Sequence, residues 1–330
     1  MNKTYDVIVI GAGMAGLTAA NRVQQAGKSV CVLDKSRSFG GRMSTRREGP
    51  LYWDHGAQYF TAQSAEFCQQ VNTWLQQGVV ALWDTPIGAW DGAHLTATEP
   101  HLRYVGVPVM KSPLQLLAGE LLIYFNQAVR NLLKTPSGWQ IKTDAEIFKA
   151  KNLVVTLPAP QAAALLPADC AAHALAKRVN MQPCWALMLA TQAQVQLPYG
   201  GIFINQGPLA WVAADSTKPL RNNAAHTWVI HASAEWSQQQ LEKTAAEITP
   251  LLIDEFNHLL KTWQPNKPTP DWHPVVAHRW RHARGAVMAA TQVWPEESLA
   301  IAGDWLSGGK VEGAFLSGLR CGQQLIQAGI

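Results

Sequence analysis

Three glycines near the start of the chain have the spacing of a phosphate-binding loop. Gly11, Gly13 and Gly16 form a G-x-G-x-x-G pattern between an apolar strand, residues 5–10, and a stretch with helical spacing, residues 14–26. The first glycine permits a tight turn, the second lets the backbone approach a pyrophosphate, and the third lets the helix pack on the strand. The positive end of that helix then faces the phosphate. The pattern predicts a dinucleotide site, and the alternative is a glycine-rich loop that binds nothing.

Asp34 supports the dinucleotide interpretation. It closes a second predicted strand, residues 28–33, eighteen residues after Gly16. A carboxylate at this place accepts hydrogen bonds from ribose hydroxyls and repels a 2′-phosphate, which argues against NADP. The chain therefore opens as β-α-β followed by an acidic residue. This context argues against an unliganded loop, but it does not choose between FAD and NAD.

Two later segments favour FAD. Residues 39–43 read F-G-G-R-M, and residues 54–60 read D-H-G-A-Q-Y-F. With these segments the chain resembles the flavin amine oxidase superfamily, whose members carry G-G-R soon after the acidic residue. The resemblance implies that Arg42 lies against the FAD diphosphate, with which a guanidinium pairs well. The alternative is that Arg42 belongs to a solvated basic run.

Further segments resemble the renalase-like branch of that superfamily. In that branch G-A-Q-Y follows G-G-R-M at this interval, and V-I-H-A-S at 229–233 and R-W-R-H at 279–282 look like two of its inner segments. Near the C-terminus, A-G-D at 302–304 and E-G-A at 312–314 resemble the superfamily's closing motif. The resemblance covers essentially the whole chain. The FAD-binding residues that it implies are Gly11, Ala12, Gly13, Gly16, Asp34, Lys35, Gly41, Arg42, Met43, Gln58, Tyr59, Val129, Gly303, Asp304, Glu312, Gly313 and Ala314.

The closing motif also implies how the flavin is held. Residues 313–325 are predicted to form a helix whose N-terminus stabilises negative charge at the flavin N1/O2 edge, by about 1 kcal/mol or more when partly buried. FAD is expected to bind non-covalently, because members with a tethered flavin use a cysteine before the closing motif, where residues 308–311 read G-G-K-V. Asp34 departs from the superfamily's pattern, since a glutamate is commonest there.

The order of elements predicts an α/β fold of two domains. The first is a Rossmann-type FAD-binding domain with a parallel sheet, like that of glutathione reductase, and it is discontinuous because strands are also predicted at 153–157 and 298–302. The second is a substrate domain, inserted as a mixed sheet plus helices. We expect the FAD-binding domain to comprise residues 1–60, 101–160 and 285–330, and the substrate domain to comprise residues 61–100 and 161–284.

The insertion contains its own strand and helix signals. A possible capping box of Ser237 and Gln240 precedes a helix through Ile248, which Pro250 kinks or ends. Residues 264–274 carry four prolines and are predicted to form a connector. The predicted strands are 184–190, 209–213 and 227–232.

Several residues of the insertion are candidates for the substrate site. Aromatic side chains suit a flat or cationic substrate, although most aromatic residues on strands belong to the core. His231 lies in an apolar strand that would face the flavin, with a satisfied structural histidine as the alternative. His231 and Arg279 are the candidate catalytic residues, expected to orient the substrate or to bind its phosphates. The aromatic residues of the insertion include Trp185, Trp211, Trp228, Trp236 and Trp280.

The renalase resemblance implies a particular reaction. Such an enzyme oxidises 2- or 6-dihydro isomers of NAD(P)H to NAD(P)⁺, with hydride passing to flavin N5 and dioxygen yielding hydrogen peroxide. Hydride removal from a dihydropyridine gives an aromatic cation directly, so no base has to take a proton. Two alternatives stay open, because the FAD motifs report the cofactor and not the substrate. They are a flavin amine or amino-acid oxidase or desaturase, and a non-catalytic flavin redox sensor.

Composition sets the remaining expectations. The 330 residues carry a formal charge of +4, which makes no case for nucleic acid as a partner. The five cysteines form no C-x-x-C pair, so we expect reduced thiols, no zinc or iron site and a cytoplasmic protein. No apolar run reaches the roughly 20 residues of a membrane span. The expected partners are a small-molecule substrate and dioxygen, and the oligomeric state is left open.

Overall fold

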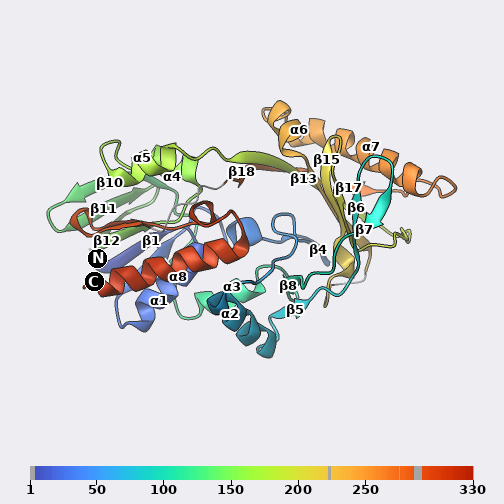
Figure 1. Ribbon diagram of the computed structural model, residues 1–330. Helices are drawn as coiled ribbons and strands as arrows, with labels where there is room; N and C mark the ends of the chain where they lie inside the picture. Colours follow the sequence, from blue (N-terminus) through green and yellow to red (C-terminus); the bar gives the residue numbers. More distant parts are fainter. Residues whose placement is uncertain (1–3, 222–223, 275, 286–291, 330) are drawn as a thin grey trace.

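Two large β-sheets lie side by side in the molecule (Figure 1). The computed structural model describes residues 4–221, 224–274, 276–285 and 292–329. The first sheet takes its strands from residues 4–33, 122–155 and 292–301. The second takes its strands from residues 87–97 and 182–284. This arrangement confirms the predicted α/β fold with a Rossmann-like domain and an additional mixed sheet.

The centre of the first sheet is parallel. β1 (Thr4–Ile10) pairs with β2 (Val30–Leu33) on one side and with β12 (Ile147–Val155) on the other. β9 (Leu122–Tyr124) and β20 (Leu299–Ile301) extend the parallel part in the two directions. Helices cover both faces, so the central strands read as continuous apolar runs instead of alternating ones.

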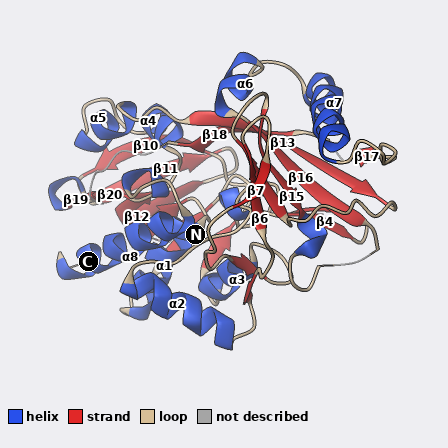
Figure 2. Cartoon of the chain, turned by 45° about the vertical axis from the view of Figure 1, so that its right-hand side comes forward, coloured by secondary structure: helices blue, strands red, loops and turns tan. Residues whose placement is uncertain are grey.

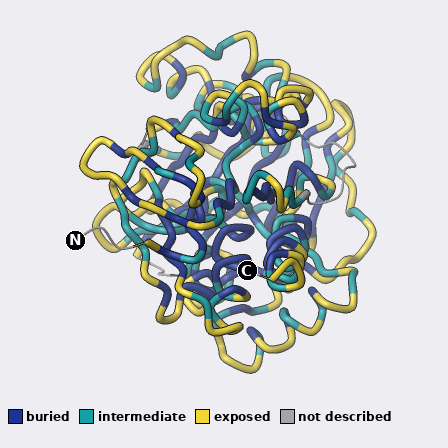
Figure 3. The backbone as a smooth tube through the Cα atoms, turned by 90° about the vertical axis from the view of Figure 1, so that its left-hand side faces the viewer, coloured by how far each residue is buried: buried dark blue, intermediate teal, exposed yellow. Residues whose placement is uncertain are grey.

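Antiparallel strands and helices complete the first sheet. Apolar side chains of the first helix, α1, and of the last, α8, pack on one face, and those of α4 and α5 pack on the other. Figure 3 shows buried backbone towards the middle of this part and exposed segments around its rim. These elements are α1 (Met14–Gln25), β10 (Val129–Thr135), β11 (Gly138–Thr143), α4 (Ala159–Leu165), α5 (Ala171–Lys177), β19 (Gln292–Trp294) and α8 (Val311–Gln327).

The second sheet is mixed and carries helices on one face (Figure 2). Its strands run in the order β17, β13, β16, β15, β14, β6, β7, and β18 also pairs with β13. The elements are β6 (Ile87–Trp90), β7 (Leu95–Ala97), β13 (Gln182–Thr191), β14 (Gly201–Ile204), β15 (Leu209–Ala214), β16 (His226–Ala232), α6 (Ala234–Gln239), α7 (Ala245–Trp263), β17 (His273–Pro274) and β18 (His278–Arg284).

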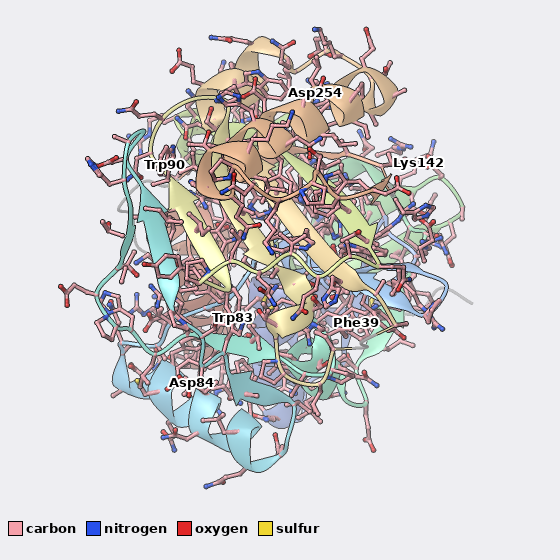
Figure 4. The ribbon with its side chains drawn as sticks, turned by 90° about the vertical axis from the view of Figure 1, so that its right-hand side faces the viewer. Phe39, Trp83, Asp84, Trp90, Lys142 and Asp254 are labelled. Atoms are coloured by element: carbon pink, nitrogen blue, oxygen red, sulfur yellow. The ribbon has the colours of Figure 1, made fainter. Side chains whose placement is uncertain are left out.

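The two faces of the second sheet have different neighbours. Alternation along β16 turns Trp228 and Ile230 towards α7, whereas Val229 and His231 face the other way. Figure 4 shows Asp254, on α7, and Trp83 on opposite sides of these strands. The face away from α7 is therefore the one that meets the first domain, and it is the face that matters for function.

Short elements join the two sheets. They are β3 (Arg46–Glu48), β4 (Leu51–Trp53), α2 (Ala65–Gln76), β5 (Val80–Leu82), β8 (Tyr104–Gly106) and α3 (Ser112–Ala118), with 3₁₀ turns at Gly41–Met43, Asp215–Thr217, Pro295–Glu297 and Asp304–Leu306. The placement of some elements corrects the predicted domain ranges. α2, within 61–100, packs its apolar face against α8, and α4 and α5 pack on the first sheet although residues 161–177 were assigned to the substrate domain. Each amphipathic helix is placed by the core that buries its apolar face.

Most predicted strands and helices are present, with two differences in the insertion. The capping box lies at Thr244 and Glu247 and not at Ser237, which is inside α6. α7 continues through Pro250, since a proline in the first turns of a helix removes few internal hydrogen bonds. Residues 264–274 form the predicted connector apart from the two-residue strand β17 at its end.

Candidate functional site

The glycine loop has the geometry of a site for a pyrophosphate. A Cβ on Gly11 would lie 2.6 Å from Thr156 Oγ1, and a Cβ on Gly16 would lie 1.9 Å from the Gly11 carbonyl oxygen. A Cβ on Gly13, by contrast, would meet no heavy atom within 4 Å. Gly11 and Gly16 are thus required by the protein's own packing, whereas Gly13 leaves its side of the loop open for a ligand. Gly13 is also the N-cap of α1, so that helix's N-terminus points at the same place.

Asp34 lies where the dinucleotide prediction places it. Its Oδ2 accepts a hydrogen bond of 2.7 Å from the Ala12 amide, and its Oδ1 accepts one of 2.7 Å from the Ser36 amide. Each carboxylate oxygen retains a further acceptor site for a ribose hydroxyl. The shorter side chain of aspartate therefore braces the glycine loop directly, and Lys35 beside it is exposed.

Arg42 and Asp304 form a bidentate ion pair across the chain. Their N–O distances are 2.9 and 2.5 Å, and Arg42 also donates to the Ala283 carbonyl at 3.2 Å. Both residues are predicted to contact the FAD diphosphate or ribityl region. The structure brings them together from positions 262 residues apart. The side chain of Arg42 is 30% exposed and that of Asp304 is 8% exposed. The partly exposed guanidinium keeps donors for a phosphate.

The segment 54–60 docks on the backbone of Arg42. The Ala57 amide donates to the Arg42 carbonyl at 2.8 Å, and a Cβ on Gly56 would lie 2.1 Å from that oxygen. Gln58 donates from Nε2 to the Asp54 and Gly56 carbonyls. Its buried Oε1 has no hydrogen-bond partner among the described residues. A buried acceptor without a donor, close to Arg42, fits a flavin site, because an N–H group of the flavin ring would donate to the Gln58 Oε1.

In the closing motif, the close packing involves the backbone at Gly303 and Gly313. Gly303 donates its amide to Ser317 Oγ at 3.0 Å, and a Cβ on Gly313 would lie 2.0 Å from the Ser307 carbonyl oxygen. Glu312 turns to another element, because its Oε1 accepts from the amides of residues 63 and 64 and from the Ser64 hydroxyl at 2.7–3.0 Å. The side chain of Glu312 thus holds the start of α2, and the FAD contact of this residue stays a prediction.

The other predicted FAD-binding residues take several places. Met43 and Ala12 are buried in the core, and Ala314 packs against the same core in the first turn of α8. Gly41 has φ +52° and lies against the Gly13 loop, since its Cβ would be 3.6 Å from the Gly13 Cα. Val129 begins β10 opposite Thr143, and its FAD contact stays a prediction.

A buried cluster of four charges holds one side of the segment 54–60. We call Asp54, Asp215, Lys218 and Arg221 the ionic anchor; all four side chains are at most 2% exposed. Arg221 Nη2 lies 2.5 Å from Asp54 Oδ2, and Lys218 bonds to both carboxylates. Arg221 also donates to the Gly106 and Pro108 carbonyls. Two carboxylates thus face two cations, and burial raises the pKa of Asp215 above its ordinary value.

The cations of the ionic anchor keep Asp54 ionised. Burial raises the pKa of Asp54, but Lys218 and Arg221 outweigh burial and bring it down to about 2. Asp54 Oδ1 further accepts from Thr45 Oγ1 at 2.7 Å and from the Met110 amide at 3.1 Å. Sequence reasoning missed this cluster, because Asp54 was visible beside H-G-A-Q-Y while its cations lie more than 160 residues away.

A cluster of histidines holds the other side of the same segment. We call His55, His231, His278 and Trp280 the histidine anchor. The His55 carbonyl accepts from Trp280 Nε1 at 2.9 Å and bonds to His231 Nε2 at 3.1 Å. The His55 ring stacks on Trp280 and meets His278 edge-on, with centroid distances of 5.0 and 4.8 Å. His231 is thus beside the predicted flavin contacts, where it fixes the backbone of the segment.

The histidines of this anchor are neutral. Burial lowers the pKa of His55 to about 3 and that of His231 to about 4. Burial likewise lowers the pKa of His278. A neutral His231 that bonds the His55 carbonyl carries its proton on Nε2, so it is a donor there. Its Nε2 therefore positions the backbone of the segment 54–60, and its Nδ1 keeps a lone pair.

The structure contradicts the predicted role of Arg279. Along β18, His278 and Trp280 alternate with Arg279 and Arg281, so the two sets point to opposite faces. The Arg279 guanidinium donates to the Leu241 carbonyl and lies 5.5 Å from the Trp185 ring centre. Arg279 consequently faces the α6 side of the sheet, away from the segment 54–60.

Aromatic rings from both domains meet beyond Tyr59. We call Tyr59, Trp83, Phe203 and Trp211 the aromatic wall. Tyr59 lies 5.7 Å from Trp211 and 6.3 Å from Trp83, and Phe203 lies 4.7 Å from Trp211, measured between ring centroids. Of the five tryptophans considered as candidates for the substrate site, Trp211 is in this wall and Trp280 is in the histidine anchor. The others, Trp185, Trp228 and Trp236, pack on the α7 side as core residues.

These features together define a class of protein. A Rossmann-like domain with an open glycine loop is joined to a mixed sheet whose inner face covers the segment 54–60, which is the arrangement of a two-domain flavoprotein oxidoreductase. A model of the family "Flavin containing amine oxidoreductase" matches residues 97–326, and a model of an "NAD(P)-binding Rossmann-like domain" matches residues 9–72. The chain belongs to the flavin-containing amine oxidoreductase family, and FAD is its cofactor.

Solved structures share this fold over nearly the whole chain. Putrescine oxidase bound to putrescine has a TM-score of 0.75 at 14% identity, covering 98% of this chain and 99% of that one. Cyclohexylamine oxidase from Brevibacterium oxydans has a TM-score of 0.74 at 13% identity, with the same coverage. At such identities the likeness shows the fold alone.

Curated relatives match over shorter stretches. A probable flavin-containing monoamine oxidase A from Dictyostelium discoideum is 37% identical over 59 residues, 18% of this chain and 13% of that protein. An L-amino-acid oxidase from Siganus canaliculatus is 42% identical over 59 residues, 17% and 11% of the two chains. Protoporphyrinogen oxidase 2 from Arabidopsis thaliana is 28% identical over 155 residues, 46% and 26%. This chain thus spans about a quarter or less of the length of these relatives.

The site residues fit FAD. The open side of Gly13, the Arg42–Asp304 pair and the unpaired Gln58 oxygen lie along one path from the start of α1 to the segment 54–60. Among the described residues no helix is long and apolar enough to cross a membrane.

Proposed function

We propose that this flavin-dependent oxidoreductase oxidises isomeric dihydronicotinamides, the 2- and 6-dihydro forms of NAD(P)H, to NAD(P)⁺. When bound, FAD supplies the acceptor for a hydride and passes two electrons on to dioxygen, which gives hydrogen peroxide. The protein's part is to hold the segment 54–60 still between its two anchors and to offer the aromatic rings beside Tyr59 to the substrate ring.

The observation that carries this proposal is that the polar groups described at the inner face of the second sheet are engaged in holding the segment 54–60. His231 is neutral and bonded to the His55 carbonyl, and the carboxylates of Asp54 and Asp215 are paired with cations. A dihydropyridine that loses a hydride becomes an aromatic cation without losing a proton. Such a substrate needs stacking and orientation, which the aromatic wall supplies.

An amine oxidase is the second candidate, and the aromatic wall is the observation in its favour. Rings such as Tyr59 and Trp211 attract an ammonium group through cation–π contacts. The solved structures with this fold include a putrescine oxidase and a cyclohexylamine oxidase. A diamine, however, would need a carboxylate for its second ammonium, and the two inner carboxylates named above are already neutralised. A flavin redox sensor remains a third candidate, marked by flavin reduction without turnover.

Anaerobic flavin bleaching tests the three candidates. The holoenzyme is mixed with borohydride-treated NAD⁺, which contains the isomers, and in parallel with ordinary 4-dihydro NADH, amines and amino acids. We expect rapid bleaching with the isomers alone, and reoxidation in air with one hydrogen peroxide per isomer consumed. Bleaching by amines but not by the isomers would replace this proposal with the amine oxidase, and reduction without repeated turnover would favour the sensor.

A further inference from the structure

Arg103 turns a charged side chain into the protein beside the aromatic wall. It directly precedes β8, and its carbonyl accepts from the Trp83 amide at 2.8 Å. Leu102 is 63% exposed, whereas Arg103 is only 7% exposed. The Arg103 guanidinium carbon lies 5.3 Å from the centre of the Tyr59 ring. The guanidinium is therefore one contact away from the segment that is predicted to bind the flavin.

The charge of Arg103 is not cancelled within the described part of the chain. No described carboxylate lies within 4 Å of it, and its buried Nε has no hydrogen-bond partner. Its Nη1 makes one long hydrogen bond, 3.4 Å, to the His101 carbonyl. Arg221 is similarly buried and its Nε also lacks a partner, yet its two Nη atoms bond to Asp54 and to three carbonyls. A desolvated cation without a counter-charge is costly to the fold, which points to a ligand that completes it.

A second unused donor lies against the same tyrosine. Trp211, whose ring is 5.7 Å from that of Tyr59, has a buried Nε1 without a hydrogen-bond partner among the described residues. Arg103 and Trp211 thus both lie beside Tyr59, and each has a buried nitrogen without an acceptor among the described residues. An arginine fork matches the oxygens of a phosphate.

We propose that Arg103 binds a phosphate of the substrate, with Trp211 Nε1 as a supporting donor. This inference rests on the proposed function, because a dihydronicotinamide nucleotide carries the phosphate. In this arrangement the substrate's nicotinamide ring lies along the aromatic wall, and its phosphate end is fixed at Arg103. Arg103 determines which substrate binds, and it takes no part in the hydride transfer itself.

The test compares a substrate that has the phosphate with one that lacks it. Anaerobic stopped-flow flavin reduction is measured for the dihydro isomers of nicotinamide mononucleotide and of nicotinamide riboside, in wild type, Arg103→Gln and Arg103→Lys. Loss of a charge-assisted hydrogen bond predicts an apparent Kd for the mononucleotide isomers raised about 10- to 100-fold in Arg103→Gln. The riboside isomers and the limiting reduction rate should change less than about twofold, and Arg103→Lys should restore part of the affinity.

Arg281→Gln is the matched control, because it removes an arginine whose side chain is 42% exposed and paired with Glu242 on the opposite side of the sheet. It should leave both substrates unchanged. Equal effects of Arg103→Gln on mononucleotide and riboside, or no effect on either, would overturn the proposal. Loss of bound FAD in Arg103→Gln would also overturn it, since Arg103 would then serve the cofactor.

A second arm separates this inference from the proposed function. If wild-type holoenzyme is bleached by no dihydronicotinamide, the proposed function fails, and inorganic phosphate becomes the probe. A phosphate-dependent rise in Tm in wild type and Arg281→Gln, lost in Arg103→Gln, supports a phosphate subsite at Arg103. No rise in wild type, or the same rise in all three proteins, rejects it.

Discussion

The ionic anchor and the histidine anchor hold the same segment by opposite means. Asp54 and His55 are adjacent, yet Asp54 enters a cluster of four buried charges while His55 enters a cluster of neutral rings. The ionic anchor fixes the segment through charge that is balanced inside the protein. The histidine anchor fixes it through two hydrogen bonds to one carbonyl and through stacking.

Because of this difference, the two anchors lose their contributions to the free energy of unfolding at different pH values. The pKa of Asp54 is lowered, so its contribution to stability is complete above its unfolded value of about 4 and is lost as pH falls towards 2. The pKa values of His55 and His231 are also lowered, but from about 6.5. Below pH 6.5 these histidines become protonated in the unfolded chain but stay neutral in the folded protein. The free energy of unfolding therefore falls as the pH drops from 6.5 towards 4. At pH 5 the histidine anchor is weakened while Asp54 keeps its charge.

Breaking the ionic anchor should have the largest effect. Asp54→Asn keeps the shape of the side chain but leaves Lys218 and Arg221 with a single buried carboxylate, Asp215. We expect a loss of about 3–5 kcal/mol in the free energy of unfolding, because an uncompensated charge remains in the interior. Urea denaturation of the holoenzyme at pH 7 measures it.

Asp144→Asn is the control for this prediction. Asp144 also pairs with an arginine, Arg130, but both side chains are more than half exposed. Such a surface pair contributes little to stability, because water screens it. Equal losses in the two variants would show that burial does not distinguish the ionic anchor from a surface ion pair.

The next effect is a change in pH dependence. His231→Gln keeps a donor for the His55 carbonyl but has no proton to gain. Each buried neutral histidine costs about 1.4 kcal/mol per pH unit below 6.5, so His231 accounts for about 3 kcal/mol between pH 6.5 and 4. His55 and His278, whose pKa values are also lowered, continue to titrate in the variant. We therefore expect the slope of unfolding free energy against pH to fall by about a third, measured by urea denaturation from pH 7 to 4.5.

Asp54→Asn should leave that slope unchanged, since Asp54 is ionised throughout this range. A slope that stays the same in His231→Gln would mean that His231 is protonated in the folded protein. The histidine anchor would then be charged like its neighbour, and the contrast between the two anchors would disappear.

A smaller loss is expected from Trp280→Phe. The phenyl ring keeps part of the stacking on His55 but removes the donor to the His55 carbonyl, which retains His231. One lost hydrogen bond and a smaller ring contact correspond to about 1–2 kcal/mol. Thermal unfolding gives the stability, and FAD titration of the apoprotein shows whether a looser segment 54–60 binds the cofactor less tightly. Unchanged FAD affinity would separate this anchor from the cofactor site.

The parts of the site that depend on local motifs could be predicted from the sequence. A tight turn, an exposed helix N-terminus and an acidic residue after the second strand follow from residues within one β-α-β unit, so the loop at Gly13 and the position of Asp34 were predictable. The apolar runs of the strands around 184–190 and 227–232 were predictable for the same reason. The capping box was misplaced because a second match, Thr244 with Glu247, lies seven residues further on and carries a glutamate at N3.

The two anchors and Arg103 could not be predicted, because their partners are distant in sequence. Asp54 and Arg221 are 167 residues apart, and His55 and His231 are 176 apart. Strand alternation indicates that Arg279 and Trp280 face opposite ways, but only the pairing of β18 with β13 decides which of them faces inward. Whether a buried arginine is neutralised likewise depends on contacts between elements that no local pattern contains.

Arg279→Gln tests that register and should have the smallest effect. The substitution removes a hydrogen bond to the Leu241 carbonyl and a contact with Trp185, both on the α6 side of β18. A side chain that is about one-third exposed should cost about 0.5–1 kcal/mol of stability. The rate of flavin reduction and the apparent Kd of the reductant should match wild type, measured by anaerobic stopped flow beside Trp280→Phe. A large loss of reduction rate in Arg279→Gln alone would place Arg279, and not Trp280, on the inner face of the sheet, and the histidine anchor would have to be assigned again.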